Sequence, residues 1–353
     1  MSDKKEKSIS ANENEKNAET KKGKKAGKII KRVVIAVLSL VVAFVLLFAI
    51  SSVILEFCPG KNEGNGDGTN PYIVEKTLVS AHRSGGEIAP ENTMAAFKNC
   101  IESEDFNVDI FEFDLHITAD GKVILLHDST LDRTTNAAEY FGYEEVLPET
   151  KTYEELRQLN FGENFEDPDG NFPYRGLRGD DIPDELRAVL LEDVLDYLES
   201  NGHYQYIIEI KNDGENGFRA ADELYRILKE RNLIADCVFG TFNQDVTDYV
   251  DDTYPDMLRS SGIREVVDFY FMATFNVNVD DDHFKFEALQ IPANQFKVAR
   301  LGNERIVNYA HKHNIAVQYW TINEADEVER LSSIGADCIM SDNPSMAYDV
   351  INK

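Results

Sequence analysis

The sequence predicts an α/β fold, a TIM-type (β/α)8 barrel with an insertion after the third strand, preceded by one transmembrane helix. Three observations favour it. Short apolar runs alternate with amphipathic runs of helical period, which is typical of parallel strands covered by helices. Residues 72–353 form one long acidic part, which suits a single barrel of this kind better than two small domains. Charged and histidine side chains follow several strand candidates, where the active sites of barrels form.

Residues 1–32 form a basic tail on an otherwise acidic chain. The chain has 36 Lys+Arg and 64 Asp+Glu, a formal net charge of −28. Residues 1–32 hold 11 Lys+Arg and 5 Asp+Glu, so the remainder carries −34. We expect this tail to be disordered, because it lacks aromatic residues and cannot bury enough surface to offset the entropy of ordering. The acidic remainder argues against nucleic-acid binding, since phosphate backbones are held by Lys and Arg.

Residues 33–55 form an apolar run that contains no charged residue. About 20 residues at a rise of 1.5 Å per residue cross the hydrocarbon layer, so we predict a single transmembrane helix here. Lysines are dense just before the run, which predicts a cytoplasmic N-terminus and an extracytoplasmic C-terminal part. Residues 56–71 follow as a flexible linker with four glycines and two prolines.

The apolar run has alternative interpretations. A signal peptide would be cleaved after small residues near 49–51, although the run is long for one. A lipoprotein anchor at Cys58 is disfavoured, because Phe57 stands where a small residue is needed. A buried core helix is disfavoured as well, since every face of the run is apolar.

Strand and helix candidates alternate through the acidic part. The strand candidates are residues 77–82, 109–115, 122–127, 204–210, 237–242, 257–261, 287–293, 315–321 and 337–341. The helix candidates are residues 91–103, 153–159, 186–200, 217–232, 303–313 and 324–334. Nine strands compete for eight barrel places, so one of them is wrong or lies outside the barrel. The weakest is 257–261.

One connection is far longer than a crossover requires. It runs from His127 to the strand candidate that begins at residue 204. Much of it consists of Gly, Pro, Asn, Asp and aromatic residues. Long irregular loops on α/β barrels usually serve as lids or substrate-facing insertions, so we predict an insertion over about residues 129–203.

Chemically active side chains gather at the ends of the first four strand candidates. They are His82, Arg83, Glu112, Asp114, His127, Glu209 and Lys211. Residues two apart share one face of a strand, so Glu112 points with Asp114, and Glu209 with Lys211. Carboxylates among apolar neighbours are costly unless they are paired or bind a ligand. A salt bridge between Glu209 and Lys211 is the structural alternative for one pair, but the whole set favours a site.

The residue types indicate metal-assisted phosphoryl chemistry. Glu112, Asp114 and Glu209 offer only oxygen ligands, which suits one hard divalent cation, Ca2+ or Mg2+. Two histidines suit general acid and base roles, because their ordinary pKa lies near neutral pH. Arg83 can donate two parallel hydrogen bonds to phosphate oxygens. We expect His116 to point away from the carboxylate pair and to have a structural role.

Several segments together resemble the glycerophosphodiester phosphodiesterase family. They are AHRSGGEIAPENTMAAF (81–97), FEFDLHITADGKVILLHDSTLDRTTN (111–136), IIEIK (207–211), QYWTIN (318–323) and GADCIMSDNP (335–344). The resemblance implies a TIM-type barrel that cleaves glycerophosphodiesters to sn-glycerol 3-phosphate and an alcohol. It assigns acid/base catalysis to His82 and His127, substrate contact to Arg83, Lys211, Trp320 and Glu91, and the metal to Glu112, Asp114 and Glu209. Ser84 stands where the family usually has Gly, so we expect a tight turn shifted by one residue.

The preferred interpretation is therefore a membrane-anchored enzyme that faces outward and acts on a glycerophosphodiester or a glycerol-phosphate-containing substrate. Two alternatives stay open: a phospholipase-like lyase that acts on intact lipids, and a catalytically inert surface binding domain. The intact histidines and carboxylates argue against the inert domain, because buried charges without a ligand are costly. No feature of the sequence indicates an oligomeric state.

Overall fold

The computed structural model describes residues 2–58, 60, 64, 66, 68–280, 283–293 and 300–353. The chain divides into two compact units, Met1–Ile54 and Leu55–Lys353. The predicted linker, residues 56–71, lies partly outside the described residues, so its flexibility stays a prediction.

Helix α1 (Ser2–Phe57) contains the predicted span. Its segment Ile30–Leu55 is long and apolar enough to cross a membrane, a property that signal sequences share. The helix begins at Ser2, and the disorder expected of residues 1–32 from their composition stays a prediction. Lys, Glu and Ala are good helix formers and no proline interrupts the segment, which favours continuation of the apolar helix toward the N-terminus.

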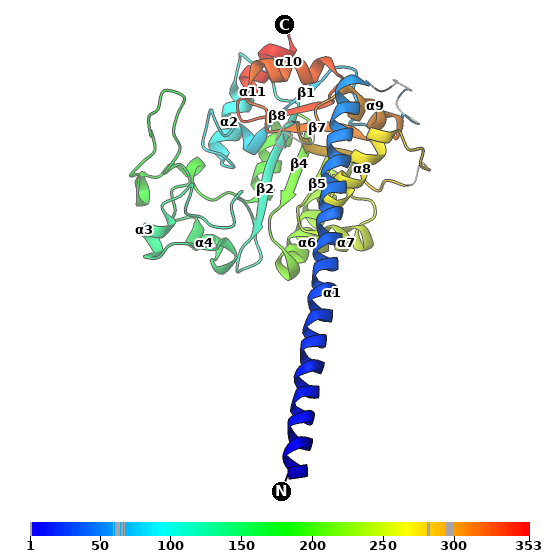
Figure 1. Cartoon of the computed structure of the whole chain (residues 1–353). Coiled ribbons are helices and arrows are strands. Elements are labelled where there is room, and N and C mark those ends of the chain that lie inside the picture. The colour runs from blue at the N-terminus through cyan, green and yellow to red at the C-terminus, as the bar shows by residue number, and fades with distance from the viewer. Residues whose placement is uncertain are drawn as a thin grey trace. The chain divides into compact units, whose positions relative to one another are not determined.

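The second unit is built on a near-closed parallel barrel (Figure 1). Its seven hydrogen-bonded strands have the order β5-β4-β2-β1-β8-β7-β6, and each neighbouring pair is parallel. In chain order they are β1 (Leu78–Ala81), β2 (Ile110–Ile117), β4 (Gln205–Ile210), β5 (Cys237–Gly240), β6 (Ala288–Pro292), β7 (Ala316–Trp320) and β8 (Cys338–Ser341). The predicted TIM-type barrel is confirmed.

The strand outside the barrel is a different one from the one expected. β3 (Val123–Leu125) pairs antiparallel with β2, outside the barrel order. Residues 118–122 between them form a tight turn, with Gly121 at φ +76°, and a loop this short permits antiparallel pairing only. Residues 257–261, regarded as the weakest candidate, instead occupy the gap between β5 and β6, where Arg259 bridges Phe239 and Ser260 bridges Ala288, both in parallel.

A buried arginine holds this closing segment in place. Arg259 is 3% exposed, and its guanidinium binds Asp251 of α7 (Gln244–Thr253) at 2.6 Å and Glu265 of α8 (Ile263–Phe275) at 2.8 Å. Its backbone N–H donates to the Glu287 carboxylate at 2.9 Å. Backbone hydrogen bonds also join the segment to both neighbours, for instance from Ser260 N–H to the Phe239 carbonyl at 2.8 Å and from Ser261 N–H to the Ala288 carbonyl at 2.9 Å. Side chains and backbone together thus secure the eighth place of the barrel.

Helices cover the outside of the barrel. Those that match helix candidates are α2 (Met94–Glu102), α4 (Tyr153–Leu156), α5 (Leu191–Asn201), α6 (Gly214–Arg231), α9 (Glu304–Lys312) and α10 (Ala325–Ser333). Three of the described barrel helices were not predicted, namely α7, α8 and α11 (Pro344–Ile351). α7 is rich in Asp and Thr, which are weak helix formers, and α8 is dominated by β-branched and aromatic residues, so neither has a strong helical signal.

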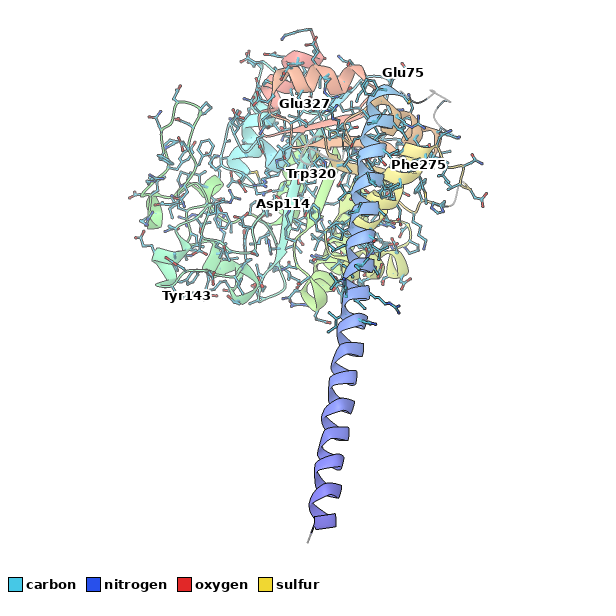
Figure 2. All side chains as sticks on the ribbon, in the orientation of Figure 1. Glu75, Asp114, Tyr143, Phe275, Trp320 and Glu327 are labelled. Atoms are coloured by element: carbon cyan, nitrogen blue, oxygen red, sulfur yellow. The ribbon has the colours of Figure 1, made fainter. Side chains whose placement is uncertain are left out.

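The predicted insertion follows β3 and lies to one side of the barrel strands, with α3 (Ala137–Phe141) and α4 in it (Figure 1). It has a small apolar core of its own, formed by Ile124, Leu126, Leu131, Ala137, Val146, Leu156, Leu159, Phe161 and Ala188. Tyr143 lies at its outer edge, whereas Asp114 and Trp320 belong to the barrel strands β2 and β7 (Figure 2). The insertion is therefore a packed substructure, which can hold side chains in fixed positions.

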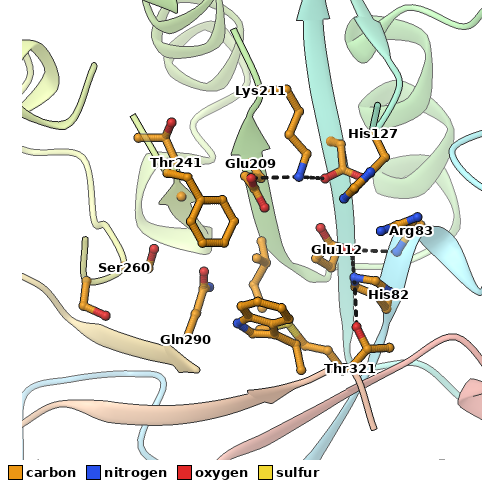
Figure 3. Close-up of a pocket in the computed structure, with 17 residues that line it drawn as sticks. His82, Arg83, Glu112, His127, Glu209, Lys211, Thr241, Ser260, Gln290 and Thr321 are labelled. Atoms are coloured by element: carbon orange, nitrogen blue, oxygen red, sulfur yellow. Dashed lines mark hydrogen bonds and ion pairs between the residues drawn. The ribbon is translucent and has the colours of Figure 1, made fainter. Parts of the chain in front are cut away.

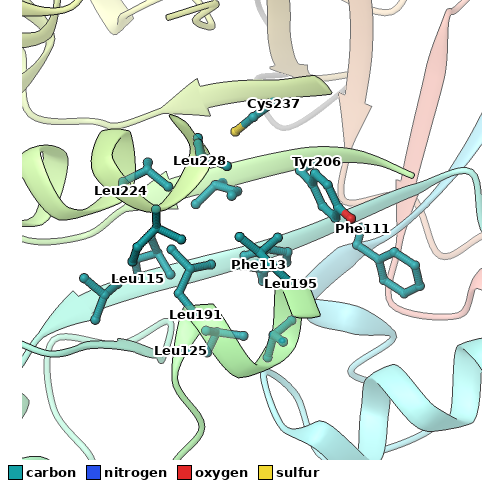
Figure 4. Close-up of a cluster of buried hydrophobic side chains, with 14 of the residues drawn as sticks. Phe111, Phe113, Leu115, Leu125, Leu191, Leu195, Tyr206, Leu224, Leu228 and Cys237 are labelled. Atoms are coloured by element: carbon teal, nitrogen blue, oxygen red, sulfur yellow. The ribbon is translucent and has the colours of Figure 1, made fainter. Parts of the chain in front are cut away.

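Alternation along β2 separates the packing face from the chemical face. Phe111, Phe113 and Leu115 belong to a buried cluster that also includes Leu191 and Leu195 of α5 (Figure 4). Burying each such side chain contributes about 1.5–3 kcal/mol. The residues between them, Glu112 and Asp114, must then point into the barrel. The apolar face thus positions the two carboxylates and supplies stability to offset their burial.

The lower part of the barrel interior is apolar. Ile110 and Ile207 share a buried cluster with Cys338 and Met340, and Leu78 and Trp320 pack against it. Ile110 and Ile207 precede Glu112 and Glu209 by two residues on the same strand faces, so this cluster lies on the amino-terminal side of the charged residues. The charged site consequently has an apolar floor.

Candidate active site

A pocket at the carboxyl ends of the barrel strands gathers eight of the nine residues predicted for the site (Figure 3). The eight are His82, Arg83, Glu112, Asp114, His127, Glu209, Lys211 and Trp320. The ninth, Glu91, lies beside the pocket, where its carboxylate pairs with Arg83 at 3.3 Å. Sequence positions from 82 to 320 therefore converge on one place.

Each histidine of the pocket is held by an aspartate. His82 Nδ1 lies 2.6 Å from Asp342 Oδ1, and His127 Nδ1 lies 2.7 Å from Asp128 Oδ1. A carboxylate only accepts hydrogen bonds, so Nδ1 is protonated in each ring and Nε2 is the atom left for chemistry. His82 Nε2 lies 3.4 Å from the Thr321 hydroxyl and 3.9 Å from Glu112, both of which line the pocket.

The two imidazoles differ in their tendency to be charged. Burial lowers the pKa of His82, but the carboxylates of Glu112 and Asp342 outweigh burial and raise that pKa above its ordinary value. Burial lowers the pKa of His127 below its ordinary value, and the charge of Lys211 acts in the same direction. Near neutral pH, His82 therefore keeps its second proton more readily than His127.

Lys211 joins two of the three carboxylates. Its Nζ lies 2.9 Å from Asp114 and 2.7 Å from Glu209, so the salt bridge considered as the structural alternative is present inside the site. Asn92 donates to the other oxygen of Asp114 at 2.9 Å. Burial raises the pKa of Asp114, but Lys211, His127 and Asn92 reverse the shift, and the net pKa is lowered.

Of the three carboxylates, Glu112 is the one that does not share the salt bridges of Lys211. It accepts a hydrogen bond from the Arg83 backbone N–H at 2.6 Å. Burial and the nearby charge of Asp114 raise its pKa well above the ordinary value. A buried carboxylate with a raised pKa is stabilised in its charged form by any cation that binds beside it.

The donor set fits a hard divalent cation in chemistry and charge. Glu112, Asp114 and Glu209 provide only oxygen, and carboxylate oxygens have lone pairs beyond those used by the hydrogen bonds seen here. Among the described residues, no three His, Cys, Asp or Glu side chains are arranged as a ready metal site. Lys211 Nζ takes the position between Asp114 and Glu209, so binding of a cation would require it to move.

Arg83 has donors free for an anion. Its Nη1 pairs with Glu91, whereas its Nε is buried without a hydrogen-bond partner among the described residues. A buried unpaired N–H costs roughly 1–3 kcal/mol, which a phosphate oxygen in the pocket would remove. The phosphate contact expected of Arg83 stays a prediction, and Nε is the donor it would use.

The turn that carries Arg83 differs from the expectation of a shifted turn. Arg83 (φ +49°) and Ser84 (φ +65°) are both left-handed, and Gly85 follows at φ +90°. Ser84 therefore occupies the strained position itself. Its side chain is fully buried and its Oγ has no hydrogen-bond partner in the described part of the chain.

We expect Ser84→Gly to raise the free energy of unfolding by about 1 kcal/mol. Glycine removes the cost of roughly 1–2 kcal/mol of a left-handed residue with a Cβ, and the greater entropy of the unfolded chain offsets part of this gain. Urea unfolding of the full chain in detergent, followed by the fluorescence of the single tryptophan Trp320, measures it. Ser80→Gly is the matched control, since Ser80 is equally buried but lies in strand β1 and should lose stability. A lower stability for Ser84→Gly would contradict the strain argument.

The wall formed by later strands was missed by the sequence analysis. Thr241, Phe242, Ser260 and Gln290 line the pocket together with the predicted residues. Gln290 is oriented by a 2.9 Å hydrogen bond to Gln318. Isolated neutral residues of this kind give no sequence signal. The ring of Trp320, which was predicted, meets Phe242 edge to face, with 6.1 Å between their centroids.

His116 lies on the same strand face as Glu112 and Asp114, so the expectation that it points the other way is wrong. β2 is regular from Ile110 to Ile117, and residues 112, 114 and 116 alternate with the packing face. The side chain is buried outside the residues that line the pocket, and burial lowers its pKa to about 4. A neutral His116 agrees with the structural role expected for it.

The chain is a TIM-type barrel whose strand ends gather two aspartate-held histidines, three carboxylates and an arginine in one pocket. More specifically, the chain belongs to the glycerophosphoryl diester phosphodiesterase family, whose model matches residues 82–346.

Relatives agree with this placement over most of the chain. A glycerophosphodiester phosphodiesterase of Caldanaerobacter subterraneus subsp. tengcongensis is 27% identical over 79% of this chain and 99% of its own length. One of Bacillus subtilis is 23% identical over 86% and 96%. The structure of an Oleispira antarctica phosphodiesterase, solved with the product sn-glycerol-3-phosphate, superposes with a TM-score of 0.57 at 20% identity and covers 79% of this chain and 98% of that one.

Proposed function

We propose that this chain hydrolyses glycerophosphodiesters to sn-glycerol 3-phosphate and an alcohol. The observation that carries the proposal is the pair of aspartate-held histidines, His82 and His127, which line one pocket with Arg83 and Lys211. Each of the two histidines could transfer a proton, and the positively charged side chains of Arg83 and Lys211 could hold a phosphate between them. Family membership supports the same reaction.

The charge states suggest which histidine does what. His127 has the lowered pKa, so its neutral Nε2 takes the proton from the attacking oxygen, either water or a hydroxyl of the substrate itself. His82 has the raised pKa, so its Nε2 gives a proton to the departing alkoxide. The bond from phosphorus to the alcohol oxygen breaks as the bond to the attacking oxygen forms. Attack by a substrate hydroxyl gives a cyclic phosphate, which water then opens to the same product.

The remaining predicted residues serve binding in this proposal. Arg83 and Lys211 hold phosphate oxygens, while Trp320 packs against the glycerol and Glu91 orients Arg83. Trp320 is suited to that contact because its ring lies at the pocket with Phe242 beside it.

A divalent cation, Ca2+ or Mg2+, belongs to the proposal. Glu112, Asp114 and Glu209 would hold it, because three buried carboxylates line one pocket and a bound cation would stabilise their charges beside a phosphodiester anion. When bound, the cation supplies Lewis-acid stabilisation of negative charge on the phosphate. The chain's own residues still hold and move the protons.

The experiment is turnover by the full-length chain in detergent with glycerophosphocholine or glycerophosphoglycerol and Ca2+ or Mg2+. Release of sn-glycerol 3-phosphate that depends on the cation would support the proposal. A cyclic phosphate as the final product would indicate a lyase instead. A folded protein that binds substrate and never releases product would indicate the inert binding domain.

We further propose that residues 33–55 are a retained anchor with residues 1–32 in the cytoplasm, and that residues 72–353 form the catalytic domain outside. The lysine-rich segment before the apolar run supports this orientation. Cys58 is exposed, whereas Cys100, Cys237 and Cys338 are buried thiols. In intact cells, an impermeant maleimide is therefore expected to label the wild-type chain and to spare Cys58→Ser. A labelled chain that lacks its first 49 to 51 residues by mass would indicate a cleaved signal peptide.

A further inference from the structure

Arg133, a residue of the insertion, is connected to the active site through ion pairs with Glu91 and Asp128. Arg133 lies six residues after His127, and its guanidinium makes two bidentate pairs with carboxylates, each called a fork below. One fork holds Glu91, with Nη1 at 2.9 Å and Nη2 at 2.7 Å from the two carboxylate oxygens. The other holds Asp128, with Nε at 2.5 Å and Nη2 at 3.1 Å.

Both carboxylates held by Arg133 also hold a residue of the proposed machinery. Asp128 accepts from His127 Nδ1 at 2.7 Å, and Glu91 pairs with Arg83 Nη1 at 3.3 Å. A continuous network therefore runs His127–Asp128–Arg133–Glu91–Arg83. It links the proposed proton acceptor to the proposed phosphate clamp through one guanidinium.

Arg133 itself does not line the active-site pocket, so it has no place among the catalytic residues. It borders a neighbouring cavity between the Glu91 segment and the insertion, which Asn164 also lines. Asn164 Nδ2 donates to the Arg133 carbonyl at 3.0 Å, so a later part of the insertion fixes the backbone that carries Arg133.

We propose that Arg133 is a positioning residue that sets the orientation of His127 and Arg83 together. On this view the insertion is a brace: it supports the site through Arg133, although none of residues 129–203 lines the active-site pocket. Asp128 could rotate away from His127 without the fork, and the tautomer with a free Nε2 would no longer be selected. Glu91 would likewise lose its hydrogen bonds to Arg133, and Arg83, which pairs with Glu91, would be less firmly positioned.

The proposal rests on the proposed function for its kinetic test. We expect Arg133→Met to lower kcat about 10–100-fold, the usual effect of losing a group that orients a catalytic ligand or base, and to raise KM because Arg83 is less well placed. Arg133→Lys should recover little, because an ammonium cannot hold two carboxylates in two forks. Arg178→Met is the matched control.

Arg178 lies in the same insertion and also bridges two carboxylates, Glu139 at 2.5 Å and Glu163 at 2.7 Å, but none of the three lines the active-site pocket. Its loss should change stability as much as the loss of Arg133 and leave kcat and KM unchanged. Equal kinetic effects for the two methionine variants would overturn the proposal, since the effect would then come from the insertion in general.

A double-mutant cycle and a spectroscopic signal complete the test. If Arg133 acts through Asp128, the kcat loss of the Arg133→Met, Asp128→Asn double variant should not exceed that of Asp128→Asn alone, whereas additive losses would contradict this route. The 15N imidazole shifts of His127 should show a lower fraction of the Nδ1–H tautomer in Arg133→Met than in wild type. This readout needs no turnover, so a wild type without activity would refute the proposed function and leave the brace testable. An unchanged tautomer fraction would refute the brace.

Discussion

Replacing His127 by alanine is expected to lower kcat by about 10²–10⁴-fold, the contribution of a general base positioned at the reacting oxygen. The loss should fall on kcat more than on KM, because Arg83 and Lys211, which hold the phosphate, remain in place. The measurement is steady-state release of sn-glycerol 3-phosphate across pH 4–9 with saturating cation.

The pH profile carries a second expectation for His127. A base must be neutral to act, so wild-type activity should fall as pH drops through the pKa of His127, which burial holds below the ordinary histidine value of about 6.5. That acidic limb should be absent from the residual activity of His127→Ala. His203→Ala is the control, since His203 is exposed and meets carboxylates only at 3.3 and 3.5 Å. A kcat within threefold of wild type would remove His127 from the mechanism.

The fold could be predicted as far as local patterning extends. Period-2 strands such as β2 and β4 and amphipathic helices such as α6 are visible in the sequence. The antiparallel β3 was predictable too, because Asp120-Gly121 is a turn signal and so short a loop cannot make a parallel crossover. The apolar character of β3 favours a barrel strand, whereas the length of its connection to β2 decides the pairing.

The closing segment at Arg259 was among the strand candidates, but local patterning could not assign it to the barrel. Its place in the barrel rests on backbone hydrogen bonds to β5 and to residues 287 and 288, and on ion pairs of Arg259 with Asp251 and Glu265. These partners lie on other elements, so no local pattern reports them. A single arginine within so short a run instead weakens the prediction of a buried strand.

In the candidate site too, local patterns predict some features, whereas others depend on partners distant in sequence. Alternation on β2 and β4 was enough to bring Glu112, Asp114, Glu209 and Lys211 together, since strand faces are fixed by parity. Asp342 and Arg133 stood within the recognised motifs, but nothing local indicates that one holds His82 and the other bridges Glu91 and Asp128. Roles that depend on a partner distant in sequence needed the structure.

Replacing Glu112 by glutamine is expected to lower kcat/KM about 10³-fold, and removal of the cation by a chelator should reduce the wild type by at least as much. A cation that stabilises charge on a phosphate contributes several kcal/mol to the transition state, and a tenfold change in rate corresponds to about 1.4 kcal/mol. Glu112 is suited to test this because it accepts a backbone hydrogen bond from Arg83 but has no ammonium partner of its own among the described residues. Glutamine keeps its shape and removes its charge.

A binding measurement separates loss of the cation from loss of the fold. Without cation, Glu112→Gln should be at least as stable as wild type, because the variant removes the repulsion between two buried carboxylates, Glu112 and Asp114. Adding Ca2+ or Mg2+ should raise the melting temperature of the wild type, as a ligand bound only by the folded state does, and raise that of Glu112→Gln much less. Glu287→Gln is the matched control: Glu287 also accepts a backbone N–H, at 2.9 Å from Arg259, but lies outside the pocket. Its cation-induced shift and turnover should equal those of wild type. If Glu112→Gln kept the full shift, the cation would bind elsewhere and the carboxylates of this pocket would serve Lys211 alone.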